Sequence, residues 1–159
     1  MKKLIKVLPF LFLIFSCAEK EVKKEIKIVI VEKDVGEFSE ESFHKELDKF
    51  NWKFKDVVYA QAKLESDFSS ENFKLRNNLF GMKVAKSRLT TAKESKKSAH
   101  ARYDDWKLSI VDRALFESAF MRKLKTREQY LNYLAENYAG DKNYKKKLLK
   151  IIEDGGFKN

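Results

Sequence analysis

Residues 57–65 read Val57-Val-Tyr-Ala-Gln-Ala-Lys-Leu-Glu65, a run without glycine or proline that predicts a helix. Val58, Ala62 and Glu65 fall at positions i, i+4 and i+7, so their side chains share one face of this helix. An apolar stripe therefore ends in a carboxyl group. Periodicity alone favours a solvated carboxylate at a helix end, whereas burial on the stripe would raise the pKa of Glu65 and suit it to donate a proton.

Further helices are expected on both sides of this segment. Ser39 is a good N-cap for a preceding helix in which Phe43, Leu47 and Phe50 form one apolar stripe. Three helices follow, predicted by caps and apolar spacing: one over residues 106–121 behind Asp104 or Asp105, one opened by the capping box of residues 126–129 and stopped at Gly140, and one over residues 144–152.

Residues 66–105 show no long periodic pattern. Asn77, Asn78 and Gly81 are turn formers, and short strands are expected at residues 89–91 and 99–103. The predicted fold class is therefore mainly α, of the α+β kind, with a helical domain and a small irregular or β lobe.

The composition indicates one folded domain with a positive charge. Hydrophobic residues make up 43% of the 159 residues and aromatic residues 13%, which excludes a disordered or collagen-like protein. A single cysteine excludes a disulfide-stapled mini-protein and a cysteine-built zinc site. The net charge of +10 indicates a polyanionic partner, which could be nucleic acid, anionic lipid or a charged cell-wall polymer.

Residues 1–16 have the layout of a secretory signal peptide, with lysines followed by an apolar run that is too short to span a membrane. The sequence Ile14-Phe-Ser-Cys17 resembles the lipobox of bacterial lipoproteins, which implies cleavage before Cys17 and lipid attachment to that cysteine. An ordinary signal peptide with an incidental cysteine is the alternative. Residues 17–38 are then a charged, lipid-anchored linker, and loss of the three signal-peptide lysines lowers the net charge from +10 to +7.

Four blocks of the sequence occur in a recognisable order: residues 60–66, then Asn77-Asn-Leu-Phe-Gly-Met-Lys83, then Tyr103-Asp-Asp-Trp106 leading into residues 109–112, then Tyr138-Ala-Gly-Asp-Lys-Asn-Tyr144 leading into Leu148 and residues 151–152. Together they resemble the endo-β-N-acetylglucosaminidase family of peptidoglycan hydrolases, which share a lysozyme-like fold. The resemblance covers about residues 41–153. It implies a lysozyme-like domain over residues 39–154, followed by a tail at residues 155–159.

The resemblance implies that Glu65 is the catalytic general acid, which delivers a proton to the leaving oxygen. A second carboxylate, where the family has one, follows paired threonines, and Thr90-Thr91 are followed only by Glu94. A solvated charge is the alternative for Glu94. If Glu94 is only a solvated charge, the substrate's own N-acetyl group, or a sugar hydroxyl as in lytic transglycosylases, would take the place of the second carboxylate. No cofactor or metal ion is implied, and His44 and His100 have no metal-site spacing.

Five further residues are candidates for substrate binding: Asn77, Asn78, Phe80, Tyr103 and Tyr138. Amides can bond to the N-acetyl and hydroxyl groups of a sugar, an aromatic ring can stack on its apolar face, and a tyrosine hydroxyl can orient the acid. Turn formation is the alternative for the asparagines, and core packing is the alternative for the aromatic residues. Gly140 stands where this family block commonly has threonine, so that side-chain contact is missing here.

Residues 83–102 contain seven basic residues and one acid without interleaved aromatic residues, which argues against a nucleic-acid partner. A basic lip would attract the stem-peptide carboxylates of peptidoglycan, and a solvated loop is equally consistent. We therefore expect an exported, membrane-anchored monomer in the cell envelope, facing the periplasm, that acts on peptidoglycan as an endo-β-N-acetylglucosaminidase. Muramidase or lytic transglycosylase action on the other glycan bond, or a non-catalytic wall-binding module, are the alternatives.

Overall fold

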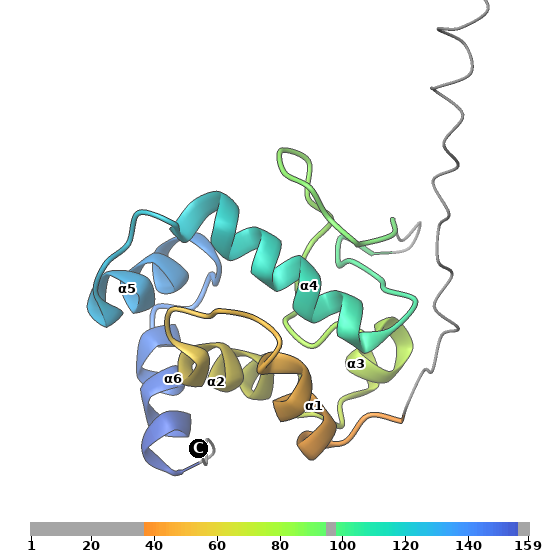
Figure 1. The fold of residues 1–159 in the computed structure, drawn as a ribbon, viewed down its shortest axis with the longest axis horizontal. Helices are drawn as coiled ribbons and strands as arrows, with labels where there is room; N and C mark the ends of the chain where they lie inside the picture. Colours follow the sequence, from red (N-terminus) through yellow and green to blue (C-terminus); the bar gives the residue numbers. More distant parts are fainter. Residues whose placement is uncertain (1–36, 95–97, 156–159) are drawn as a thin grey trace, which may run out of the picture. The chain divides into compact units, whose positions relative to one another are not determined.

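The computed structural model describes residues 37–94 and 98–155, which form six α-helices and one π-helical turn (Figure 1). In chain order these are α1 (Glu40–Leu47), α2 (Lys55–Ser66), α3 (Glu71–Arg76), α4 (Trp106–Phe116), η1 (Glu117–Met121), α5 (Arg127–Asn137) and α6 (Tyr144–Glu153). The predicted signal peptide, the predicted lipidation site Cys17 and the predicted linker up to residue 36 lie outside the described residues, as do residues 156–159. Within the described part, no helix is both long and apolar enough to cross a bilayer.

Helix α2 is the central helix of the domain, since its residues 57–62 are all buried. Val58 and Ala62 belong to a hydrophobic cluster that also contains residues of α1 and α4. Val57 and Ala60 belong to a second cluster, built with residues of α5 and α6. Because α2 packs on opposite sides, the position of its C-terminal end is fixed by both clusters, and this is the end that carries Glu65.

Side-chain caps mark the starts of four helices, and three of these starts agree with the sequence prediction. Ser39 and Ser42 form a capping box at the start of α1, and Thr126 and Gln129 form one at the start of α5. The Asp105 side chain accepts a hydrogen bond from a backbone N–H in the first turn of α4. The helix starts predicted at these three places are confirmed.

Some helix boundaries differ from the prediction. The sequence pattern gives no sign of α3, because six residues are too few to show helical periodicity, although Ser70 caps this helix. Helix α5 ends at Asn137 rather than at Gly140. The helix expected over residues 106–121 is present, but its last five residues form the π-helical turn η1. The Lys53 ammonium binds three backbone carbonyls where this turn ends, those of Met121, Arg122 and Leu124.

In its described residues, the segment between α3 and α4 is irregular, which is one of the two forms that the sequence predicts for this lobe. The strands predicted at residues 89–91 and 99–103 are wrong, since the described part of this segment contains no strand. It contains two isolated antiparallel bridges, Lys83 with His100 and Lys93 with Arg102. The backbone here does not continue these bridges into a strand ladder, and a side chain attaches the segment to α4. The Thr91 hydroxyl donates a hydrogen bond to the Leu108 carbonyl (2.7 Å). The mainly helical prediction is confirmed, and the β structure of the described residues is limited to these two bridges.

Candidate active site

Glu65 lies in the last turn of α2 with its side chain half-buried. The hydroxyl of Tyr144, the first residue of α6, donates a hydrogen bond to Glu65 Oε1 (2.8 Å). The loop after α3 approaches the other carboxyl oxygen, since a Cβ placed on Gly81 would lie 2.9 Å from Glu65 Oε2. Gly81 also has a φ of +63°, which residues with a side chain rarely adopt. The backbone conformation therefore favours glycine at this position, and a larger residue would also displace the Glu65 carboxyl group.

Burial raises the pKa of the Glu65 carboxyl above its ordinary value, because the charged form loses hydration. The Tyr144 hydrogen bond and the positive charge of Lys147 lower the pKa of Glu65, but burial has the larger effect. Burial and the Glu65 charge also raise the pKa of Tyr144, so its hydroxyl keeps its proton and remains a donor. Glu65 therefore holds its proton to a higher pH than an exposed glutamate does.

A cavity of about 420 Å³ opens at Glu65. It is bounded by the end of α2, the loop at Gly81, the loop between α5 and α6, and the first turn of α6. His100 and Lys147 also line it. Among the described residues, the cavity has one further carboxylate, Asp141, which forms an ion pair with Lys147 (2.6 Å). Glu65 is thus the lining carboxyl group that is free of an ion pair within this part of the chain.

A second cavity of about 310 Å³ adjoins the first. The two share Gly81, Lys83 and Tyr138 as lining residues. The second cavity continues between the loop of residues 83–88 and an aromatic wall formed by Phe116 and Phe120. A ligand longer than one sugar unit can therefore contact both cavities.

The predicted sugar-binding residues Asn77 and Asn78 hold the loop beside the first cavity. Asn77 ends α3 in the left-handed conformation (φ 54°) and donates to the Tyr103 carbonyl (3.2 Å). Asn78 is buried, and its amide nitrogen donates to the carbonyls of Met82 and Ala101 (2.9 and 3.0 Å). Its amide oxygen accepts from the Met82 N–H (3.1 Å). This geometry agrees with the turn-forming interpretation of both residues.

Of the three aromatic candidates, Tyr138 alone lines the two cavities. Phe80 and Tyr103 lie in the core with exposed fractions of 0% and 1%. The Tyr138 hydroxyl donates to the Phe80 carbonyl, and its ring contacts Phe116 edge to face at 5.4 Å. Tyr138 therefore offers ring surface to a ligand while its hydroxyl holds the loop of Phe80.

The structure does not bring Glu94 to Glu65. The Glu94 side chain is exposed and lines neither cavity. In residues 37–94 and 98–155, no group of three or more His, Cys, Asp or Glu side chains could hold a metal ion. Among the described residues that line the first cavity, Glu65 is therefore the carboxyl group that is free of an ion pair and can transfer a proton.

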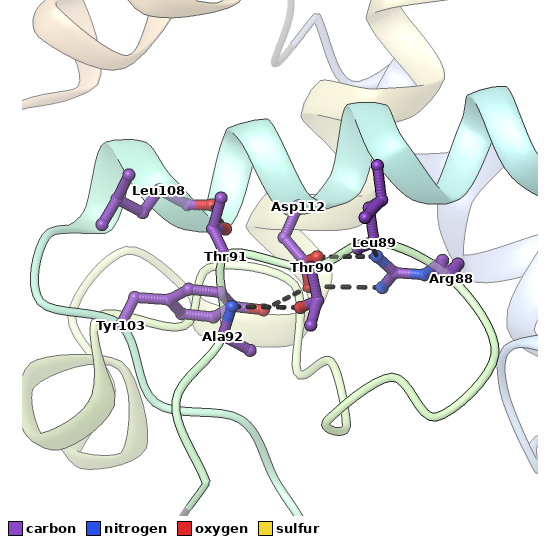
Figure 2. Close-up of polar contacts among 8 residues, drawn as sticks. All are labelled: Arg88, Leu89, Thr90, Thr91, Ala92, Tyr103, Leu108 and Asp112. Carbon is purple, nitrogen blue, oxygen red and sulfur yellow. Dashed lines mark hydrogen bonds and ion pairs between the residues drawn. The ribbon is translucent and has the colours of Figure 1, made fainter. Parts of the chain in front are cut away.

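A buried ion pair fastens the loop of the second cavity to α4 (Figure 2). The Arg88 guanidinium donates to both carboxyl oxygens of Asp112 (2.6 and 3.2 Å), and the Tyr103 hydroxyl donates to the same carboxylate (2.8 Å). The side chains of Arg88 and Asp112 are 6% and 0% exposed. The Thr91 bond to Leu108 adds a second attachment one turn earlier on α4. Asp112 thus holds one wall of the second cavity in place, although Asp112 itself does not line that cavity.

Sequence patterns pointed to Glu65 but missed its neighbours Tyr144, Gly81 and Lys147. Tyr144 fits the apolar stripe of the last helix, and Gly81 fits an ordinary turn. One pattern in the sequence did connect two of these neighbours. Tyr144 and Lys147 are three residues apart at the start of the last predicted helix, so their side chains must share one face of it. The polar end of a tyrosine on a buried stripe needs a hydrogen-bond partner, which Glu65 supplies.

Comparison with known proteins identifies the family. Residues 40–156 match the family described as glucosaminidase, mannosyl-glycoprotein endo-beta-N-acetylglucosaminidase. The crystal structure of the catalytic domain of the autolysin Auto from Listeria monocytogenes is similar to this chain, with a TM-score of 0.50 and 22% identity. That match covers 91% of this chain and 96% of the Auto domain, and at this identity it shows a common fold. No curated protein matches the sequence. Since the family match spans most of its length, the chain belongs to the glucosaminidase family of glycoside hydrolases.

Proposed function

We propose that this protein hydrolyses the β-1,4 bond that follows N-acetylglucosamine in peptidoglycan, with Glu65 as the general acid. The observation that carries the proposal is the half-buried Glu65 carboxyl group, which lines the first cavity and accepts a hydrogen bond from Tyr144. Family membership supports cleavage of a glycosidic bond to N-acetylglucosamine. The likeness to the catalytic domain of an autolysin supports the cell wall as the substrate.

In this proposal the protonated Glu65 donates its proton to the glycosidic oxygen as the bond to the sugar breaks. The sugar carbon then carries positive charge until a water molecule attacks it, forms the new C–O bond and returns a proton to the Glu65 carboxylate. Asp141 is already paired with Lys147, and Glu94 is exposed outside both cavities. We therefore assign stabilisation of that carbon to the substrate's own N-acetyl oxygen, with Glu94 as the alternative second carboxylate.

Export and membrane attachment belong to the same proposal and rest on the sequence. Residues 1–16 act as the signal peptide, Cys17 carries the lipid, and residues 17–38 link it to the domain in the cell envelope. The wild-type protein is expected in the membrane fraction with a lipid-sized mass increase on Cys17, and Cys17→Ala is expected to lose both. A wild-type protein found wholly in the soluble fraction would contradict the anchor.

The bond that is cleaved is tested by digestion of purified peptidoglycan, reduction of the products with borohydride and mass spectrometry. The expected products carry reduced N-acetylglucosamine at their ends. Reduced N-acetylmuramic acid would assign the enzyme as a muramidase, and anhydro-muramic ends would assign it as a lytic transglycosylase. Either result would overturn the proposed bond while leaving family membership intact.

Gly81→Ala is expected to lower both stability and activity. The left-handed backbone at φ +63° costs an alanine about 1–2 kcal/mol, and the new Cβ would lie 2.9 Å from Glu65 Oε2. Displacing the acid is expected to lower kcat by about 10²-fold. Chemical denaturation and peptidoglycan turnover measure the two effects.

Alanine variants of two other glycines distinguish the backbone effect of Gly81→Ala from the effect of its new Cβ on Glu65. Gly155 has a φ of +76° with open space around it, so Gly155→Ala is expected to lose stability but keep kcat. Gly140 lines the first cavity, and a Cβ there would meet nothing within 4 Å. Gly140→Ala is therefore expected to keep both. If all three variants had the same kcat, the proposed contact between Gly81 and the acid would be wrong.

Tyr144→Phe is expected to move the alkaline limb of kcat/KM to higher pH. The hydroxyl of Tyr144 stabilises the ionised form of Glu65, so its removal raises the pKa of Glu65 further. Activity requires the protonated acid and is lost as pH rises through that pKa. Lys147→Gln removes a positive charge near Glu65 and is likewise expected to move the alkaline limb of kcat/KM to higher pH. Tyr133→Phe on α5 is the matched control, and an unshifted limb in Tyr144→Phe would contradict the assignment.

A further inference from the structure

The second cavity has two unlike walls, one basic and one aromatic. One wall is the loop of residues 83–88, and the other is formed by side chains at the end of α4 and in η1. The cavity adjoins the one that holds Glu65, through the shared residues Gly81, Lys83 and Tyr138. A group attached to a sugar beside the cleaved bond can therefore enter it.

The loop wall carries positive charge that is not neutralised within the described part of the chain. Arg88 is satisfied by Asp112 (Figure 2). Lys83 and Lys86 are exposed, and among the described residues neither has an ion pair with a carboxylate. Sugar hydroxyl and N-acetyl groups are neutral and gain little from two ammonium groups. The charge of this wall is complementary to a ligand with carboxylates.

The opposite wall is aromatic and partly open to solvent. Phe120 in η1 remains 43% exposed, although its ring contacts Phe116 edge to face at 5.2 Å. Both rings line the second cavity. An exposed aromatic pair favours a ligand that has methyl or methylene groups as well as charge. A phosphate polymer would use the lysines but would leave this apolar surface unused.

We propose that the second cavity binds the acidic peptide branch of peptidoglycan. Lys83 and Lys86 pair with carboxylates of the branch, while Phe116 and Phe120 pack against its aliphatic side chains. The proposal rests on the proposed function, because it takes peptidoglycan as the substrate. Binding of the peptide branch in this cavity makes the enzyme selective for glycan that still carries peptides.

The test measures binding to the full-length Glu65→Gln protein by calorimetry, so that turnover does not interfere. Two ligands are compared: the disaccharide unit of peptidoglycan with its acidic tripeptide, and the same disaccharide with an uncharged amide in place of the peptide. The peptide-bearing ligand is expected to bind about tenfold more tightly, which corresponds to about 1.4 kcal/mol. This preference is expected to weaken as ionic strength rises.

Lys86→Glu and Phe120→Ser, each added to Glu65→Gln, change residues that line the second cavity and not the first. Each is expected to lower affinity for the peptide-bearing ligand about fivefold and to leave the bare disaccharide unaffected. Lys146→Glu on α6 is the matched control, because Lys146 is exposed and lines neither cavity. This control is expected to keep the full preference.

The outcomes separate this inference from the proposed function. Equal affinity for the two ligands, with wild-type protein that hydrolyses peptidoglycan, would overturn the peptide subsite and leave the function standing. Displacement by a phosphate polymer but not by free tripeptide would also overturn it. A peptide preference in a wild-type protein that releases no sugars would support the subsite and overturn the hydrolase proposal.

Discussion

Glu65→Gln is expected to lower peptidoglycan turnover by about 10²–10⁴-fold, because an amide cannot deliver a proton to the leaving oxygen. Glutamine has nearly the same shape, and its amide oxygen can still accept the Tyr144 hydrogen bond. The loss is therefore expected in kcat with little change in KM. Release of soluble sugars from purified cell wall measures it.

The same substitution is expected to raise the melting temperature near neutral pH. Burial raises the pKa of Glu65 in the folded protein above its unfolded value, so the carboxyl group costs folding free energy once pH exceeds the unfolded pKa. That cost is absent at lower pH, where the group is protonated in both states, and it is absent from an amide. A more stable and inactive variant would separate catalysis from folding, as expected of an active-site acid.

Glu94→Gln is the comparison for this experiment. The exposed Glu94 lies outside both cavities, so its substitution is expected to keep the wild-type rate. Wild-type activity in Glu65→Gln would remove Glu65 as the acid. A loss in Glu94→Gln comparable to that in Glu65→Gln would restore Glu94 as a second carboxylate.

Asp112→Ala is expected to destabilise the protein by about 3–5 kcal/mol, the usual cost of removing one partner of a buried ion pair. The substitution leaves the Arg88 guanidinium and the Tyr103 hydroxyl without their acceptor in a buried site. It also frees the loop that forms one wall of the second cavity. Urea denaturation measures the loss, and an increase in KM is expected in the molecules that remain folded.

The control replaces the whole group with apolar residues, as Arg88→Met, Tyr103→Phe and Asp112→Leu together. Because no charge is then left unpaired, most of the lost stability is expected to return. The loop would be held less specifically, so the KM is expected to stay high. A cost below about 1 kcal/mol for Asp112→Ala, the range of an exposed pair, would contradict the role of this ion pair.

The predicted features that agree with the structure are those that depend on neighbours along the chain. The capping serine and threonine at residues 39 and 126 bond three residues ahead, and the stripe of α2 follows from helical spacing. The strands expected at residues 89–91 and 99–103 are wrong because β-propensity depends on tertiary context. Here Thr91 bonds to a carbonyl of α4, a contact that local sequence does not encode.

The candidate site was predictable in part for the same reason. Glu65 stands on a local stripe, and the family resemblance singles it out. Its hydrogen bond from Tyr144 joins residues 79 apart in sequence, and it exists because α2 packs against α6. The residue types of Asn77 and Asn78 suit both a turn and a sugar contact, so sequence alone could not choose between these roles.

The central proposal is that burial raises the pKa of Glu65, so that the carboxyl group holds its proton to a higher pH and can act as the general acid. An NMR titration of the Glu65 carboxyl carbon in the wild-type protein, assigned by comparison with Glu65→Gln, tests this most directly. We predict a pKa above the ordinary glutamate value of about 4.3, equal to the pKa of the alkaline limb of kcat/KM. A Glu65 pKa at or below the ordinary value would contradict the account, because the site would then not favour the protonated form that a general acid requires.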